Sequence, residues 1–136
     1  LGYLMTGDLS LLHAVAQQLP EWNVSSIAQR AGISALKDTE YEKRTRQLIE
    51  KERRYLIQEF LKMGCTVFPS EADYITFRLP QEKTGFLLKE RLLEGKILIR
   101  SCANYRNMPP DCYRIAVKQH ADNEELVRQV WRILKQ

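Results

Sequence analysis

Two arginines, Arg100 and Arg114, each lie at one end of a short apolar run that is typical of a β-strand. Arg100 follows the apolar residues 97–99, and Arg114 precedes the apolar residues 115–117. A guanidinium stays charged at any working pH and donates two parallel hydrogen bonds, which match a carboxylate or a phosphate. If the two runs are neighbouring strands, both arginines face one cleft and hold a small dianion by its two ends. The alternative is that each arginine pairs with a glutamate on a helix.

Other residue types that could do chemistry lack a supporting pattern. Cys65, Cys102 and Cys112 are an odd number without metal-ligand spacing, so we interpret them as small apolar residues and expect no metal site. His13 and His120 have no partner at catalytic or metal-binding spacing, and we assign them no role. Asn104 and Tyr105 lie in the connection between the two arginine-bearing runs and are further candidates to reach the same ligand.

The composition is that of a soluble globular domain. The chain has 136 residues, of which 44% are apolar and 28% are charged. The net charge is +4, but acidic and basic residues alternate in residues 38–56, which favours a solvated helix face over a nucleic-acid partner. No apolar stretch has the length of a membrane span, so we expect a cytoplasmic protein without a membrane partner.

Along the chain, the apolar periodicity is mainly helical in the first half and alternates between strand-like and helical in the second half. Residues 1–5 are typical of a short strand, although no strand-like segment follows within the next sixty residues. Apolar periodicity then predicts three helices, over residues 8–19, 25–37 and 39–63. Asp8 caps the first helix, Pro20 stops it, and Gly64 ends the third.

Short strands and two more helices are expected in the second half. The predicted strands are residues 65–69, 74–80, 97–100 and 113–118, the first two of them antiparallel. The predicted helices are residues 84–96, with Gly95 at the end, and residues 121–134, with Asp122 or Asn123 as the cap. This order indicates an α+β fold in which long helices precede a small, mostly antiparallel sheet with helices packed on it.

Four stretches carry a resemblance to a known group of enzymes. They are Leu1-Gly2-Tyr3, LPEWNVSSIAQRAGISAL at residues 19–36, ILIRSCANY at residues 97–105 and YRIAVKQHADNEEL at residues 113–126. In this order they resemble the C-terminal part of fold-type I pyridoxal-phosphate-dependent enzymes of the class I/II aminotransferase family, in the group of histidinol-phosphate aminotransferase and threonine-phosphate decarboxylase. The resemblance implies that residues 1–40 are a remnant of the large domain with inter-domain helices and that residues 41–136 are the small C-terminal domain.

The resemblance also implies roles and a reaction. Arg114 matches the arginine that clamps the substrate carboxylate, and Arg100 matches one that helps to bind the substrate phosphate. Residues 97–105 are similar to threonine-phosphate decarboxylases, which implies decarboxylation of L-threonine O-3-phosphate in cobalamin biosynthesis. Fixing both ends of the substrate decides which bond at its α-carbon breaks. A histidinol-phosphate aminotransferase-like activity remains an alternative, and a free-standing anion-binding module is an alternative from another class.

In such enzymes the Schiff-base lysine and the other cofactor-binding residues precede the segment that matches Leu1. We therefore expect no catalytic residue and no cofactor-binding residue in this chain, which alone should bind no pyridoxal 5'-phosphate and catalyse nothing. The complete enzyme is expected to be a homodimer. Without the large domain, an apolar surface around Leu4, Leu12, Trp22 and Ile27 should be exposed and promote self-association.

Overall fold

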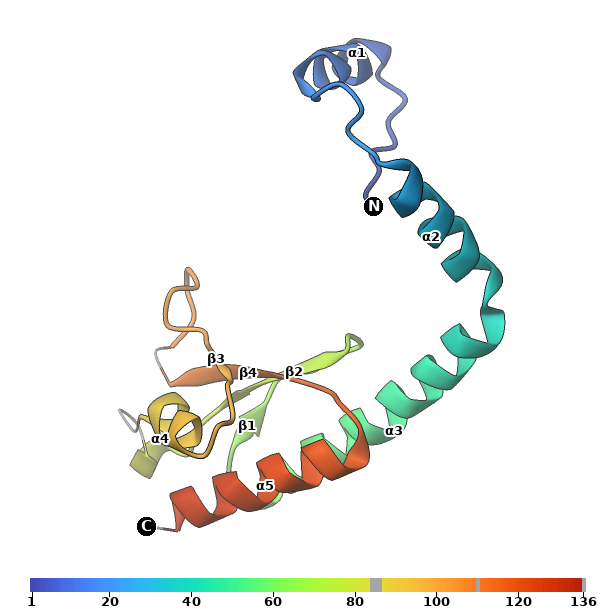
Figure 1. Ribbon diagram of the computed structural model, residues 1–136. Helices are drawn as coiled ribbons and strands as arrows, with labels where there is room; N and C mark the ends of the chain where they lie inside the picture. The colour runs from blue at the N-terminus through green and yellow to red at the C-terminus, as the bar shows by residue number, and fades with distance from the viewer. Residues whose placement is uncertain (84–86, 110, 136) are drawn as a thin grey trace. The chain divides into compact units, whose positions relative to one another are not determined.

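The computed structural model describes residues 1–83, 87–109 and 111–135 of the chain (Figure 1). It consists of two compact units, Leu1–Lys43 and Arg44–Gln136, called here the first and second unit. The boundary lies within the long helix α3 (Thr39–Lys62). The assignment of residues 1–40 to a large domain and of residues 41–136 to a small domain stays a prediction.

The first unit contains the helices that the sequence predicts. Helix α1 (Leu9–Gln18) begins after Asp8, whose side chain accepts hydrogen bonds from the backbone N–H groups of Ser10 and Leu11. Helix α2 (Ser26–Lys37) begins after Ser25, whose hydroxyl accepts from the N–H of Ala28. Each cap satisfies donors that have no partner inside the helix, so the predicted starts are confirmed.

The prediction of a strand at residues 1–5 is wrong. These residues have no regular secondary structure, and none of residues 1–43, all of which the structure describes, belongs to a strand. A strand forms only where a neighbouring backbone supplies hydrogen-bond partners, and the first unit has no such neighbour.

The second unit is built around a four-stranded sheet in the order β1-β2-β4-β3, with every pair antiparallel. The strands are β1 (Thr66–Val67), β2 (Tyr74–Arg78), β3 (Arg100–Ser101) and β4 (Cys112–Ala116). All four lie within or near the predicted segments, and the α+β fold class is confirmed. Strand β3 is much shorter than predicted, because residues 97–99 do not join the ladder.

Helices α3, α4 (Leu88–Glu94) and α5 (His120–Leu134) pack on one face of this sheet. The short 3-10 helix η1 (Gln81–Lys83) follows β2, and residues 84–86 of the predicted fourth helix lie outside the described residues. Phe60 from α3 and Phe77 from β2 are fully buried at the centre, with ring centroids 4.3 Å apart. The core joins helix and sheet side chains: Leu56, Ile75, Leu88, Leu92, Ile99, Tyr113, Ile115, Leu126, Val127, Val130 and Ile133.

The predicted cap of α5 is wrong. Gln119 occupies the cap position and makes no side-chain cap hydrogen bond. Asn123 instead lies inside the helix and is buried: its Oδ1 accepts from the N–H of Lys118 at 3.1 Å, and its Nδ2 donates to the carbonyl of Lys118 at 2.8 Å. The side chain therefore ties the β4–α5 connection together from within the core.

Candidate anion-binding site

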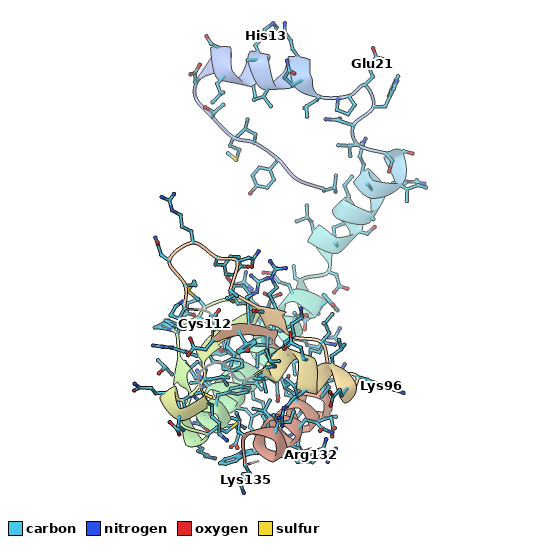
Figure 2. All side chains as sticks on the ribbon, turned by 90° about the vertical axis from the view of Figure 1, so that its left-hand side faces the viewer. His13, Glu21, Lys96, Cys112, Arg132 and Lys135 are labelled. Carbon is cyan, nitrogen blue, oxygen red and sulfur yellow. The ribbon has the colours of Figure 1, made fainter. Side chains whose placement is uncertain are left out.

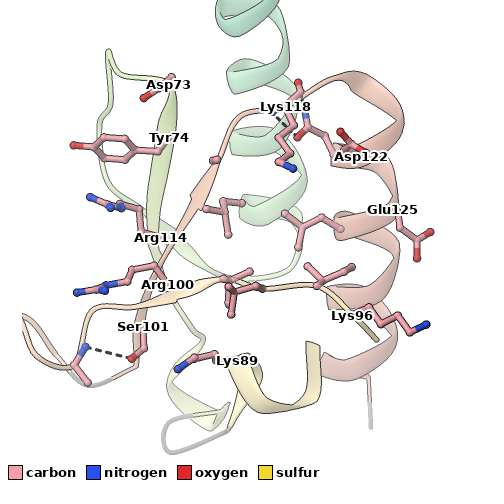
Figure 3. A pocket seen from close by; sticks show the side chains of 18 of the residues that line it. Asp73, Tyr74, Lys89, Lys96, Arg100, Ser101, Arg114, Lys118, Asp122 and Glu125 are labelled. Carbon is pink, nitrogen blue, oxygen red and sulfur yellow. Dashed lines mark hydrogen bonds between the residues drawn. The ribbon is translucent and has the colours of Figure 1, made fainter. Parts of the chain in front are cut away.

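Arg100 and Arg114 are direct partners across the β3–β4 ladder. Directly opposed residues of an antiparallel pair point to the same face of the sheet, and their neighbours Ile99 and Ile115 point to the other face, into the core. Figure 3 shows the two arginine side chains extending next to each other from their strands. Both line one open cavity of about 1110 Å³. The two arginines thus lie on neighbouring strands and line one cavity, as predicted, although residues 97–99 are not part of β3.

Neither arginine has a carboxylate partner within the described residues. Arg100 Nη2 donates a long hydrogen bond of 3.4 Å to Asn104 Oδ1, and its Cζ lies 5.7 Å from the ring centroid of Tyr105. Arg114 Cζ lies 4.7 Å from the ring centroid of Tyr74. Both arginines thus keep their charge available for a ligand, and the alternative of pairing with helix glutamates does not describe this geometry.

Arg78 on β2 differs from these two arginines because it forms an ion pair with a carboxylate. Its Nε donates to Asp111 Oδ2 at 2.9 Å, and Asp111 is buried. The other oxygen, Oδ1, is buried without a hydrogen-bond partner in the structure. Arg78 and Asp111 do not line the cavity, so this ion pair is separate from the two open cations.

Charged side chains of both signs also line the cavity. The cations are Lys89, Lys96 and Lys118, and the anions are Asp73, Asp122 and Glu125. Two adjacent guanidinium groups repel each other in the absence of a ligand. A ligand with two negative groups relieves that repulsion and pairs with both forks, which makes the site suited to a small dianion.

Tyr74, Ser101 and Lys89 line the cavity but were missed by the sequence analysis. For Tyr74 a signal exists: in the segment 74–78, polar positions alternate with Ile75 and Phe77, so Tyr74 shares a sheet face with Thr76 and Arg78. That this face also carries Arg114 follows only from the pairing of β2 with β4, which local sequence does not reveal. No comparable signal marks Lys89.

Asn104 and Tyr105 are brought to the site through Arg100, as the contacts above show. Both side chains are exposed in the connection that follows β3, and Asn104 lines the cavity. Direct contact with a ligand stays a prediction. Their present contacts make them neighbours of the cation that faces the ligand.

The three cysteines are buried free thiols. Burial raises the pKa of the Cys65 thiol to about 12. Burial also raises the pKa values of Cys102 and Cys112, although Arg100 and Arg114 work in the opposite direction at Cys102. A raised pKa disfavours the reactive thiolate, which supports the interpretation of these residues as packing groups.

His120 has a partner that the sequence did not indicate. Its Nδ1 lies 3.0 Å from Oε2 of Glu52, a buried carboxylate on α3, and its ring lies 5.0 Å from that of Tyr55. Glu52 Oε2 also accepts from Asn123 Nδ2 at 3.0 Å. Glu52 is 68 positions from His120 and 71 positions from Asn123 in the sequence, so spacing carries no signal. The cluster connects α3 with the start of α5.

The described part of the chain contains neither a cluster of metal-ligating side chains nor a helix that could span a membrane. No group of three or more metal-ligating side chains occurs within residues 1–83, 87–109 and 111–135. In the same part of the chain, every helix is too short or too polar to cross a bilayer.

Comparison with known proteins places these observations in context. The family model described as aminotransferase class I and II matches residues 1–130. A threonine-phosphate decarboxylase of Salmonella typhimurium is 33% identical over 135 residues, which cover 98% of this chain and 36% of the relative. A histidinol-phosphate aminotransferase of Oleidesulfovibrio alaskensis is 33% identical over 116 residues, covering 84% of this chain and 30% of the relative.

A solved structure agrees with the fold in detail. The histidinol-phosphate aminotransferase from Clostridium acetobutylicum superimposes with a TM-score of 0.87 at 29% identity, over 96% of this chain and 39% of the other. The chain spans about a third of the length of these relatives. The architecture is therefore that of one part of a fold-type I enzyme.

Proposed function

We propose, from the premise that this chain belongs to the class I and II aminotransferase family, that it supplies the substrate-binding cations of an enzyme acting on a small phosphorylated amino acid. Members of this family are pyridoxal-phosphate-dependent aminotransferases and decarboxylases. The observation that carries the proposal is the direct opposition of Arg100 and Arg114 on one sheet face, without a carboxylate partner in the described residues. Two open forks suit a substrate with two anionic groups.

Arg114 binds the substrate carboxylate and Arg100 helps to bind the substrate phosphate. Arg114 is half-buried on β4, between β2 and β3, where strand pairing on both sides limits its backbone motion. Arg100 is exposed on the edge strand β3. A planar carboxylate needs a well-aligned bidentate partner, whereas a phosphate accepts hydrogen bonds from several directions, which fits these two settings.

The proposed reaction is decarboxylation of L-threonine O-3-phosphate. The similarity to the Salmonella typhimurium decarboxylase over nearly the whole chain supports this choice. Amino transfer on a phosphorylated substrate is the second candidate, because histidinol-phosphate aminotransferases share as much identity and superimpose closely. Both candidates need the same two anion contacts, and they differ in which bond of the held substrate is aligned to break.

We propose that the described residues do not by themselves make a site for pyridoxal phosphate. Such a site pairs the pyridine nitrogen with a carboxylate and the aldehyde with a lysine. The buried carboxylates here are Glu52, which is committed to Asn123 and His120, and Asp111, which is committed to Arg78. Neither lines the cavity. We therefore propose that other parts of the complete enzyme bind the cofactor.

The experiment is an assay of the complete protein that contains this chain. Carbon dioxide release from phosphothreonine is measured against amino transfer to a keto acid, for the natural sequence and for Arg114→Lys. The lysine keeps the charge but loses the planar fork. We expect kcat/KM to fall by a factor on the order of 10 to 100, as for loss of one hydrogen bond to a charged group.

Arg106→Lys is the matched control, because Arg106 lies in the same connection as Asn104 and Tyr105 and does not line the cavity. It should keep the rate of the natural sequence. An Arg114→Lys protein with an unchanged rate would contradict the carboxylate assignment. Amino transfer without carbon dioxide release would select the second candidate.

A further inference from the structure

The two cations of the site are held by different kinds of structure. Arg114 is on β4, which pairs with β2 across five residues and with β3 on its other side. Arg100 is on a strand of two residues at the edge, and its contacts, Asn104 and Tyr105, come from the connection that follows the strand. The backbone of Arg114 is therefore the more firmly fixed of the two.

The side chain of Arg114 is also more closely held than that of Arg100, because it contacts the ring of Tyr74. Thr76 lies directly opposite Arg114, and Tyr74, two residues away on the same strand, lies diagonally across from it on the same face. The Arg114 Cζ is 4.7 Å from the Tyr74 ring centroid, compared with 5.7 Å between Arg100 and Tyr105. Figure 3 shows the Tyr74 ring next to the Arg114 side chain at the cavity.

A ring in this position attracts the guanidinium and limits its rotation, while the N–H groups in the guanidinium plane stay free to donate. This restraint matters because Arg100, with the same charge, is directly opposite. Like charges on opposed residues repel, so an unrestrained Arg114 would swing away into solvent. The Tyr74 hydroxyl has no hydrogen bond within the described residues, which leaves the ring as the contacting group.

We propose that Tyr74 is the positioning residue of Arg114, holding its guanidinium in the orientation that receives the substrate carboxylate. The inference rests on the proposed function, because it specifies which end of the dianion is fixed. Arg100, held only by its own connection, adapts to the phosphate end. Removal of the Tyr74 ring accordingly weakens carboxylate recognition and leaves phosphate recognition in place.

The first test measures the side chain and needs no enzymatic reaction. In this 136-residue chain labelled with nitrogen-15, NMR reports the rotation rate about the Nε–Cζ bond of Arg114. The natural sequence and Tyr74→Phe should show the same slow rotation, because both keep the ring. Tyr74→Leu should rotate faster by about tenfold. Equal rates in all three proteins would overturn the inference.

The second test separates the two ends of the substrate in the complete enzyme. Tyr74→Leu should raise KM for phosphothreonine and the inhibition constant of L-threonine, which lacks the phosphate, by about tenfold. The inhibition constant of O-phosphoethanolamine, which lacks the carboxylate, should change by less than about twofold. Tyr74→Phe should restore the natural values, because it keeps the ring.

Tyr105→Leu is the matched variant, because Tyr105 and Tyr74 are both 38% exposed and each faces one arginine. This variant should raise the inhibition constant of O-phosphoethanolamine rather than that of L-threonine. The inference would be overturned if both variants changed the inhibition constants of the two ligands equally. It would also be overturned if Tyr74→Phe raised KM and the inhibition constant of L-threonine as much as Tyr74→Leu does. Failure of the proposed function has a different signature: slow Arg114 rotation that depends on the ring, without turnover of phosphothreonine.

Discussion

Glu52 illustrates at the residue scale how this fold keeps a charge in its interior. Only 1% of its surface is exposed, yet it accepts a hydrogen bond from Asn123 and lies within hydrogen-bond distance of His120. Burial by itself raises the pKa of the carboxyl group, but the hydrogen bonds from Asn123 and His120 outweigh it, and the pKa lies below 4.5. The ionised form is therefore the one that the native state favours.

The first prediction concerns Glu52→Gln. Because the folded pKa is lowered, the ionised carboxylate contributes stability above about pH 4.5, and this contribution is lost as the pH falls through the lower folded value. We expect the substitution to reduce the free energy of unfolding at pH 7 by about 1.5–3 kcal/mol, the contribution of hydrogen bonds to a charged group. Urea unfolding monitored by circular dichroism measures this, and the variant should lose less stability than the natural sequence between pH 5 and pH 3.

Glu50→Gln provides the control on the same helix. Glu50 forms an ion pair with Arg54 one turn away, and both side chains are more than half exposed. Such surface pairs contribute about 0–1 kcal/mol, so this variant should unfold nearly as the natural sequence does. Equal destabilisation by the two substitutions would show that burial of Glu52 has no special energetic role.

At the scale of the element, the end of α3 depends on one backbone conformation. Gly64 has a φ of 80°, its N–H donates to the carbonyl of Leu61, and the N–H of Cys65 donates to that of Phe60. These two bonds close the helix and direct the chain into β1. Glycine adopts this left-handed conformation without the steric cost that a Cβ atom adds.

We predict that Gly64→Ala lowers the free energy of unfolding by about 1–2 kcal/mol, the cost of an L-residue in the left-handed region. A new Cβ would meet Pro80 at an ordinary contact distance of 3.5 Å, so the backbone is the source of this cost. Gly7→Ala is the control, because its Cβ would meet nothing within 4 Å. Thermal unfolding compares the two. A Gly64→Ala protein as stable as Gly7→Ala would contradict the argument.

The elements that sequence predicted well are those whose boundaries depend on nearby residues. Asp8 and Ser25 cap the helices that follow them, and Gly64 ends α3, as expected. The predictions are wrong where a contact with a residue far away in the sequence determines the local structure. Asn123 is no cap because it bonds to Glu52, 71 residues away, and residues 1–5 form no strand because the first unit supplies no partner.

At the scale of the whole second unit, the site likewise combines features that nearby residues determine with features that distant contacts determine. The chemistry of Arg100 and Arg114 and their position at strand ends could be predicted from residue type and apolar runs. Their direct opposition depends on the register of β3 with β4, and the contact of Tyr74 with Arg114 depends on the register of β2 with β4. Register follows from the packing of all three strands on the core, which no short segment encodes.

The first and second units differ in the burial of their apolar side chains. The apolar core belongs to the second unit, whereas none of residues 1–43 is buried. The side chains of the first unit extend away from its ribbon, as the labelled His13 and Glu21 illustrate (Figure 2). The surface expected from sequence around Leu4, Leu12, Trp22 and Ile27 is exposed, at 51%, 41%, 94% and 80% of these residues' area.

We predict that this chain associates with itself through the first unit, because burial of exposed apolar surface is favourable. Light scattering should show an apparent mass that rises with concentration. Hydrogen exchange should locate the effect, since amides of α1 and α2 gain protection on association while those of the core in the second unit are already protected. Replacement of Leu12, Trp22 and Ile27 by glutamine should suppress the association. A single monomeric species up to millimolar concentration, or association unchanged by these substitutions, would exclude this surface as its cause.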